Sequence, residues 1–322
     1  MPSKINWTDE SINPIVGCSK VSEGCQNCYA ENMARRLAAM GLEQYKQVVE
    51  RRWHSHEYHE IRHTYHGWNG KTAFVPSELD KPYRWKRPRT IFVSSMGDLF
   101  HDSVPFEWVD QVLHTAKHNP DHTFIFLTKR PQRMLEYFAG LSQPGAGTPT
   151  ARRLLSHPNY SSTWHGLHMV YLKGGALPNL VIGVSVEDQA TADERIPVLL
   201  QIPAAKRFIS LEPMIGPVDL VSSGAFDECH ANHGDIGESW LESNIHGVIL
   251  GGESGPKARP LDLAWVRLVR GQCKDAAVPF MLKQWSATGS PVSLPGVVRS
   301  GRTGFPELDG RTHTNLAWEV RK

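Results

Sequence analysis

The stretch Gly17-Cys18-Ser19-Lys20-Val21-Ser22-Glu23-Gly24-Cys25-Gln26-Asn27-Cys28-Tyr29-Ala30 holds three of the five cysteines of this 322-residue chain, spaced C-x6-C-x2-C. Thiolates this close together repel one another unless a cation takes up their charge, so the spacing predicts a metal centre. Disulfides are not expected, because three clustered cysteines leave one unpaired and the other two lie far along the chain. Gly17 and Gly24 flank the loop and permit a tight wrap.

Two kinds of metal centre fit thiolates from Cys18, Cys25 and Cys28. A structural zinc ion needs a fourth protein ligand from elsewhere in the chain. A [4Fe-4S] cluster is normally held by four cysteines, so three cysteines leave one iron open. An open iron of this kind is where S-adenosylmethionine chelates in radical enzymes, through its amino and carboxylate groups. The cluster is our leading hypothesis, and zinc is its rival.

A histidine-rich segment offers a fourth ligand for the zinc alternative. The pattern from Leu42 to about Tyr65 predicts a polar helix, in which His59, His63 and His66 share one face at spacing i, i+4, i+7. The simpler interpretation is an exposed face, since neutral imidazole suits many surfaces. A second metal site is conceivable in a later polar loop that contains Cys229, His230 and His233.

The composition suits a globular protein. Hydrophobic residues make up 40% of the chain and charged residues 21%, and no apolar run reaches the roughly 18 residues of a membrane span. The N-terminus lacks the apolar region of a signal peptide. We therefore expect no membrane partner and a reducing cytoplasm, in which unpaired thiols persist.

One segment concentrates basic and aromatic residues, although the net charge of the whole chain is only +2. From Lys46 to Arg89 there are ten Lys and Arg against five Asp and Glu, a difference of +5. Seven tyrosine, tryptophan and phenylalanine residues are interleaved with them. Basic and aromatic residues together favour phosphate contact and base stacking, so nucleic acid is one expected partner of this segment. A solvated surface insertion is the alternative.

Apolar runs that alternate with helical patterns predict parallel βα units. The expected strands are Asn13 to Val16, Thr90 to Ser94, Thr123 to Leu127, Leu180 to Val186, Arg207 to Leu211, His246 to Leu250 and a possible seventh at Pro279 to Leu282. The expected helices are Glu31 to Met40, Phe106 to Lys117, Pro131 to Phe138 and Leu261 to Ala276. No G-x-G-x-x-G follows a strand, which argues against a dinucleotide-binding fold.

The predicted fold class is therefore α/β, as a partial (β/α)6 barrel of the TIM type. The barrel is expected to span residues 1–285. It carries a His-rich basic insertion at about 42–89 and a loop insertion at about 140–178. Residues 286–322 are rich in Gly and Pro and are expected to cap an open edge or the barrel mouth.

Motifs at both ends of the chain resemble a phage-associated family with radical S-adenosylmethionine-like character, long described only as phage proteins of unknown function. The resemblance is carried by four segments: Ile5-Asn6-Trp7-Thr8, Asn13-Pro14-Ile15-Val16-Gly17-Cys18, Gly251-Gly252-Glu253-Ser254-Gly255 and Phe280-Met281-Leu282-Lys283-Gln284-Trp285, with the cysteine stretch between them. The resemblance implies a [4Fe-4S] cluster on the three cysteines, bound S-adenosylmethionine and a partial barrel of the radical enzyme kind. The common motif in such enzymes is C-x3-C-x2-C, and the first gap here is longer.

The site residues that the resemblance implies lie where barrel enzymes place them, at the carboxyl ends of strands. Tyr29 follows the last cysteine, and Met96-Gly97-Asp98 stands where related enzymes hold the methionine amino group, with Asp98 accepting a hydrogen bond. Lys129 or Arg130 could pair with the methionine carboxylate. Ser185 and Glu187 could bond the ribose hydroxyls, and two acids are expected at the mouth, contacting ribose or substrate: Glu212 and Glu253.

The implied reaction is hydrogen abstraction by a 5′-deoxyadenosyl radical, followed by rearrangement or isomerisation of a modified thymine in phage DNA. This requires a one-electron donor such as flavodoxin or ferredoxin. A second hypothesis keeps the radical chemistry and changes the substrate to a peptide or small metabolite. A third is a zinc-stabilised nucleic-acid-binding protein without catalysis.

Overall fold

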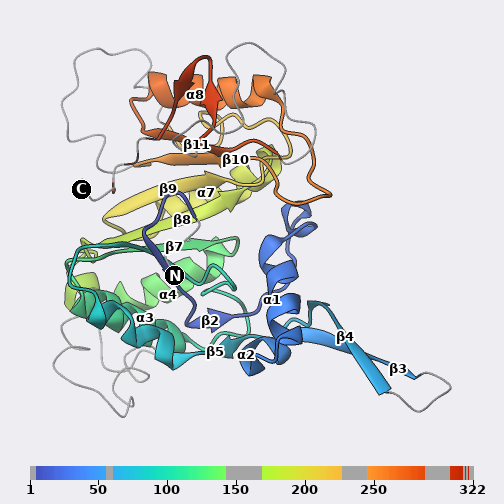
Figure 1. The fold of residues 1–322 in the computed structure, drawn as a ribbon. Coiled ribbons are helices and arrows are strands. Elements are labelled where there is room, and N and C mark those ends of the chain that lie inside the picture. The colour runs from blue at the N-terminus through green and yellow to red at the C-terminus, as the bar shows by residue number, and fades with distance from the viewer. Residues whose placement is uncertain are drawn as a thin grey trace.

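The computed structural model describes residues 5–55, 61–142, 169–226, 245–286, 305–314, 316 and 318, and the side chains of residues 54, 55, 61 and 62 are not described. Figure 1 shows a curled sheet with helices along its outside and a two-stranded hairpin that projects from the body. Among these residues, no helix is both long and apolar enough to span a membrane.

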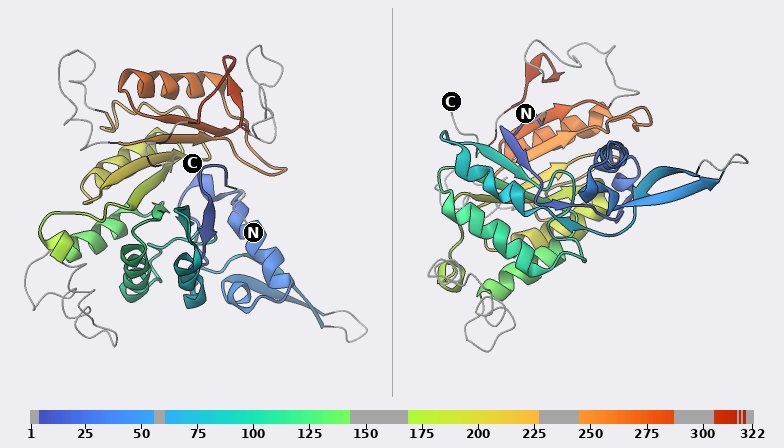
Figure 2. Two further views of the ribbon diagram at one scale, coloured as in Figure 1. Left: turned by 60° about the vertical axis from the view of Figure 1, so that its left-hand side comes forward. Right: turned by 60° about the horizontal axis from the view of Figure 1, so that its bottom comes forward.

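Seven parallel strands form the central sheet, in the order β1-β6-β7-β8-β9-β10-β11. Their bounds are β1 Glu10–Ile12, β6 Thr90–Val93, β7 Thr123–Thr128, β8 Leu180–Val186, β9 Lys206–Leu211, β10 Val248–Gly251 and β11 Phe280–Gln284. The sheet curls into a half-barrel (Figures 1 and 2), compatible with the predicted partial barrel, and the possible seventh strand is present. The first strand of this sheet is Glu10–Ile12; the predicted first strand, Asn13 to Val16, is confirmed only over β2 Ile15–Val16, which pairs with Ala73–Phe74 outside the sheet.

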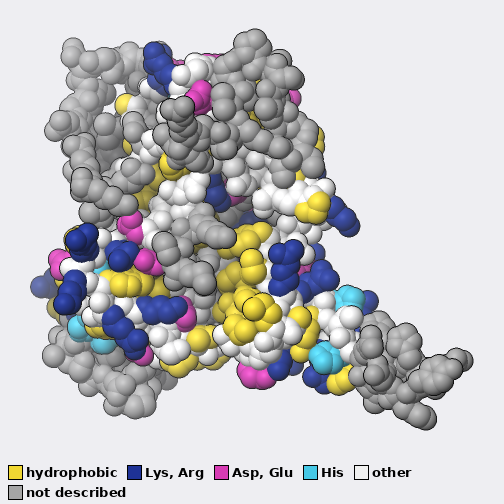
Figure 3. Space-filling model, in the orientation of Figure 1, with side chains coloured by type: hydrophobic (Ala, Val, Ile, Leu, Met, Phe, Trp, Pro, Cys, Tyr) yellow, Lys and Arg dark blue, Asp and Glu magenta, His cyan; other side chains and the backbone are white. Residues whose placement is uncertain are grey.

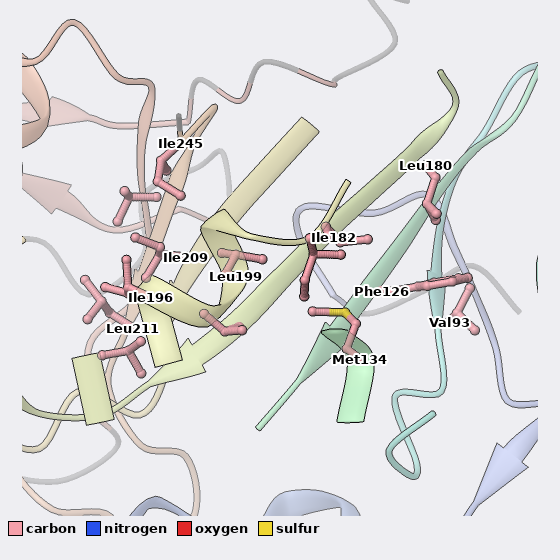
Figure 4. Close-up of a cluster of buried hydrophobic side chains, with 14 of the residues drawn as sticks. Val93, Phe126, Met134, Leu180, Ile182, Ile196, Leu199, Ile209, Leu211 and Ile245 are labelled. Atoms are coloured by element: carbon pink, nitrogen blue, oxygen red, sulfur yellow. The ribbon is translucent and has the colours of Figure 1, made fainter. Parts of the chain in front are cut away.

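Four helices cover the outer face of the sheet: α3 Phe106–His118, α4 Pro131–Ser142, α7 Gln189–Leu200 and α8 Leu263–Asp275. The main hydrophobic core lies between these helices and the strands. Figure 4 shows part of it, where Phe126, Ile182 and Ile209 from three strands meet Met134 of α4 and Ile196 of α7. The apolar i, i+3, i+4 pattern of the helices and the continuous apolar strands account for this packing.

The inner face of the sheet is filled by residues from the two ends of the chain. Trp7 lies between Phe92 and Phe208, at ring-centroid distances of 4.9 and 6.0 Å. Trp318 packs on the other side of Phe208, at 5.1 Å. These rings belong to one hydrophobic cluster, which fills the inside of the half-barrel.

A second, smaller core holds the elements beside the half-barrel: β2 Ile15–Val16, α1 Tyr29–Ala39, α2 Glu43–Lys46, β3 Val49–Ser55, β4 Ile61–Trp68 and β5 Ala73–Phe74. Short 3-10 turns follow at Pro76–Asp80 and Pro82–Arg84. The helix predicted from Leu42 to Tyr65 is wrong, because β3 and β4 form an antiparallel hairpin there. His63 and His66 consequently point to opposite faces of a strand, and His59 lies outside the described residues.

The C-terminal segment returns to the open edge of the sheet. Thr314 forms a bridge with Met281, and the Leu282 amide donates to the His313 carbonyl at 3.0 Å. A small hairpin of β12 Glu307–Leu308 and β13 Arg311–Thr312 precedes this contact. The described part of the segment thus covers the β11 edge, as expected for a cap. Most of the predicted loop insertion lies outside the described residues, at 143–168.

Candidate functional site

The carboxyl ends of the strands surround a cavity of about 860 Å³. A cavity of this size is typical of small-molecule and cofactor sites. The residues predicted for the site that line it are Cys18, Cys25, Cys28, Tyr29, Met96, Gly97, Asp98, Lys129, Arg130, Ser185, Glu212, Glu253, Lys283 and Gln284. Parallel strands deliver their ends to one edge of the sheet, which is why a list read along the sequence converges in space.

The cysteine loop runs across the cavity between β2 and α1. Gly17 has φ of 94°, which glycine adopts without the strain that a side chain would introduce. Its amide donates to the Met96 carbonyl at 3.0 Å, so the loop starts on the turn after β6. A 3-10 turn, Glu23–Cys25, follows, and a Cβ on Gly24 would lie 2.4 Å from Glu187. The loop therefore presses closely on the end of β8.

The first support of the loop is a buried ion pair. Arg130 donates to Asp98 at 2.9 Å, and both side chains are less than a tenth exposed. Arg130 also donates to the Ser19 carbonyl and hydroxyl, at 3.1 and 2.8 Å, and approaches the Cys18 sulfur at 3.6 Å. Asp98 additionally accepts bonds from Thr128 and from a backbone amide. Asp98 is thus already occupied, which favours a positioning role for it over the predicted contact with S-adenosylmethionine.

The second support is Glu187, which is fully buried and is not among the residues that line the cavity. It accepts a hydrogen bond from the Ser22 hydroxyl at 3.0 Å and pairs with Lys129 and with Arg195, the latter at 3.2 Å. The predicted ribose contact of Glu187 is therefore unsupported: the side chain faces the loop and two cations. Ser185, two residues earlier, does line the cavity.

The third support is Glu253 after β10. Arg259 donates to both of its oxygens, at 2.7 and 3.1 Å, and Asn27 of the loop donates at 3.0 Å. Arg259 also donates to the Glu23 carbonyl at 3.1 Å. Burial opposes ionisation of Glu253, but the bonds from Arg259 and Asn27 outweigh it and lower the pKa of this carboxyl.

Two further contacts complete the rim of the cavity. The Tyr29 hydroxyl donates to the Ser95 carbonyl at 3.2 Å, which joins the start of α1 to the end of β6. Glu212 and Lys283 form an ion pair across the ends of β9 and β11. The cysteine loop is therefore bonded to the ends of four strands, and an acid–base pair lines the same cavity.

The three thiols have different environments. Burial, reinforced by the charge of Asp98, raises the pKa of Cys18 to about 12. Burial also raises the pKa of Cys28. For Cys25 burial acts in the same direction, but it is outweighed by the Lys129 ammonium and loop hydrogen bonds, so its pKa is lowered. A cation bound by all three must displace protons from at least two of them.

The chemistry of the donor set is compatible with a cluster. All three thiols are free, partly buried and line the same cavity. Within the described ranges, no three His, Cys, Asp or Glu side chains gather closely enough to share one metal ion. A cluster places each thiolate on a different iron, so its ligands need not converge on one point. The second site considered at Cys229, His230 and His233 lies outside the described residues, and Cys273 is buried in the core.

The basic segment is less cationic than its composition suggests. Among the Lys and Arg of this segment whose side chains the structure describes, five are in ion pairs with acids: Lys46, Arg52, Lys81, Arg84 and Arg89. Figure 3 shows Lys and Arg in several separate groups on this face, with hydrophobic side chains gathered between them near α1. Exposed pairs of this kind leave little net field for binding phosphate.

Sequence reasoning missed the residues that support the loop from a distance. Arg195 and Arg259 follow their acids by eight and six residues, but their pairing depends on how helix and loop return to the strand end. Ser22 and Asn27 could have been predicted, because they lie inside the cysteine stretch and polar residues between metal ligands often bond to the surrounding protein.

Comparison with known proteins identifies a family. Residues 2–317 match the family described as "Protein of unknown function (DUF5131)", and the chain belongs to that family. No curated protein and no solved structure matches the chain. The family description names no activity, so the function has to be argued from the site.

Proposed function

We propose that this protein is a radical S-adenosylmethionine enzyme that rearranges or isomerises a modified thymine base in DNA. The observation that carries the proposal is that Cys18, Cys25 and Cys28 all line one cavity at the carboxyl ends of a parallel half-barrel. The DNA substrate and the phage context rest on the sequence resemblance.

The three cysteines would hold a [4Fe-4S] cluster and leave one iron open for S-adenosylmethionine. When bound, the cluster supplies the electron that cleaves S-adenosylmethionine to methionine and a 5′-deoxyadenosyl radical. The protein contributes the rest: Arg130, Glu187 and Glu253 fix the loop from three strand ends. A rigid loop keeps the cofactor in one position, and positioning is the main contribution that a protein makes to such chemistry.

The remaining polar residues of the wall suit a zwitterionic cofactor. Lys129 has three N–H donors, and its pair with Glu187 uses only part of them. Lys129 therefore remains available for the methionine carboxylate. Ser185 lines the cavity and would bond a ribose hydroxyl. Glu212, which is paired with Lys283, also lines it and would contact the ribose or the substrate.

A base inside duplex DNA cannot reach such a cavity. The target nucleotide has to be flipped out or presented in a single strand. Trp7, Phe92 and Leu127 from the inner face of the sheet line the cavity. They offer an apolar surface to a planar base.

The test is anaerobic incubation of the reconstituted protein with S-adenosylmethionine, a reductant and phage DNA that contains modified thymine. We expect 5′-deoxyadenosine and an altered nucleoside by mass spectrometry. Formation of 5′-deoxyadenosine without any change in the DNA would favour a peptide or small metabolite as substrate. Equal yields of 5′-deoxyadenosine from a Cys18→Ala variant would overturn the proposal.

A further inference from the structure

One face of the β3–β4 hairpin carries an exposed row of rings and a cation. The register places Trp53 opposite His63 and Arg51 opposite Tyr65, so these four side chains share a face. The Trp53 and His63 rings are 5.2 Å apart, as are those of His63 and Tyr65. The Arg51 guanidinium lies 4.0 Å from the centre of the Trp53 ring.

This row is open to solvent at its outer end and anchored at its inner end. Trp53 is 55% exposed, an unusual state for so large an apolar side chain. Tyr65 is buried against the smaller core, and its carbonyl accepts a bond from Arg35 of α1. The hairpin projects from the body in Figures 1 and 2. The row is therefore a rigid surface that packing within the chain does not explain.

The opposite face of the hairpin has a different chemistry. Arg52 pairs with Glu50 on its own strand, through two bonds of 3.0 and 3.1 Å. The Thr64 hydroxyl forms a hydrogen bond with the His66 ring, two residues further along β4, at 2.9 Å. These four polar side chains are bonded in pairs, whereas Arg51 is stacked on a ring and keeps the N–H edge of its guanidinium for a further acceptor.

The hairpin is also continuous with the cavity. Trp68, the last residue of β4, lines the cavity, and His63 lies five residues before it. At ~3.3 Å per strand residue, His63 lies about 16 Å along β4 from Trp68 at the cavity. Stacked nucleotides rise ~3.4 Å each, so this distance corresponds to at most about five nucleotides and to fewer in an extended strand.

We propose that the Arg51–Trp53–His63 face is a stacking platform for unpaired bases, which holds a single-stranded segment of nucleic acid within about five nucleotides of a base in the cavity. Exposed rings bind bases by their faces, and a cation stacked on such a ring meets the backbone phosphate. A paired duplex hides its base faces, so the platform selects single strands. The span of five nucleotides rests on the proposed function, but the platform itself does not.

The experiment measures binding of fluorescein-labelled dT12 to the full chain by fluorescence anisotropy, without S-adenosylmethionine. We expect Trp53→Ala to weaken binding by about tenfold or more, since stacking contributes ~1–3 kcal/mol per base, and Trp53→Phe to restore most of it. Arg51→Ala should weaken binding several-fold and reduce the salt slope by about 0.7. Its matched control is Arg52→Ala, which removes the same charge from the opposite face and should change the affinity by less than about twofold.

Four results would overturn the platform. They are an absence of dT12 binding by the wild-type chain, wild-type affinity in folded Trp53→Ala, equal losses in Arg51→Ala and Arg52→Ala, or a twelve-base-pair duplex that binds as tightly as dT12. A Cys18→Ala chain separates the two proposals. It should bind dT12 normally if the platform exists, whether or not the cysteines hold a cluster.

Discussion

Each end of the cysteine loop is held by an arginine–carboxylate ion pair, and the two pairs differ in burial. At the Cys18 end, Arg130 joins Asp98 to Ser19, and both charged side chains are less than a tenth exposed. At the Cys28 end, Arg259 joins Glu253 to Glu23, and the arginine is 27% exposed. In both, a carboxylate after a strand fixes an arginine, and the arginine holds the backbone of the loop.

The difference in burial between Arg130 and Arg259 indicates which end should be more sensitive to mutation. Asp98 and Glu253 are almost equally buried, at 7% and 5% exposed, so the two ends differ in their arginines. Removal of the more exposed Arg259 admits water to Glu253, whereas removal of the buried Arg130 leaves Asp98 with neither its cation nor solvent. Loss of the arginine at the Cys18 end should therefore lower the free energy of unfolding more than loss of the arginine at the Cys28 end. A third carboxylate with two arginines, Asp309 with Arg267 and Arg270, lies away from the site and extends the comparison to the surface.

The largest effect is expected for Arg130→Ala. It leaves Asp98 buried without its cation and should lower the free energy of unfolding by about 3–5 kcal/mol. Urea unfolding measures this loss. The double variant Asp98→Asn, Arg130→Met buries no charge and should recover part of it. A loss below about 1 kcal/mol for Arg130→Ala would mean that the Cys18 end is not the more sensitive one.

A smaller effect is expected for Arg259→Ala. Water can partly solvate Glu253 once Arg259 is gone, and Asn27 still donates to it. The free energy of unfolding should fall by about 1.5–3 kcal/mol, the range for a hydrogen bond to a charged group. The same urea titration applies, with Arg259→Lys as the conservative variant. A loss equal to that of Arg130→Ala would erase the distinction between the two ends.

Acid should weaken the Cys28 end through Glu253. Its pKa is lowered in the folded chain, so its ionised form stabilises the fold above the unfolded value of 4.5. This contribution is lost as pH falls through the lowered pKa. The difference in unfolding free energy between the wild type and Glu253→Gln should therefore be largest near neutral pH and shrink toward about pH 3. A difference that grows with acid would have the wrong sign.

The smallest effect is expected at Asp309. Hydrogen bonds from Arg267 and Arg270, each 2.6 Å at the shorter contact, lower the pKa of Asp309 to about 2. Its stabilising contribution is present above the usual value of 3.8 and is lost as pH falls toward 2. Carboxyl NMR should report the low pKa, while Asp309→Asn should leave the unfolding midpoint nearly unchanged. A large shift of the midpoint would show that solvent exposure does not weaken this pair.

The sequence predicted most of the barrel because its strands are continuous apolar runs that end in polar residues. Leu180–Val186 was predicted with its observed bounds, since all seven of its residues are buried. The hairpin was mistaken for a helix because the histidine spacing matched a helical face, whereas the alternation of Arg51 and Trp53 was the informative pattern. The edge strand Glu10–Ile12 is only three residues long and left no periodic signal.

The sequence predicted which residues gather at the cavity but not what they contact. Parallel strand ends meet by topology alone, so Asp98 and Glu253 could be placed beside the cysteines. Whether a carboxylate is free or already paired depends on arginines that arrive from other elements. Glu187 shows the limit: it stands at a strand end like the others, yet its side chain is enclosed by Ser22, Lys129 and Arg195.

The most direct measurement of the central claim is the metal content of anaerobically reconstituted protein, together with its absorbance near ~400 nm. The account predicts a brown protein with about four irons per chain, an unchanged spectrum in Cys273→Ala, and loss of both iron and colour in Cys18→Ala, Cys25→Ala and Cys28→Ala. A colourless protein that retains one zinc ion per chain, bound through the same three cysteines, would contradict it.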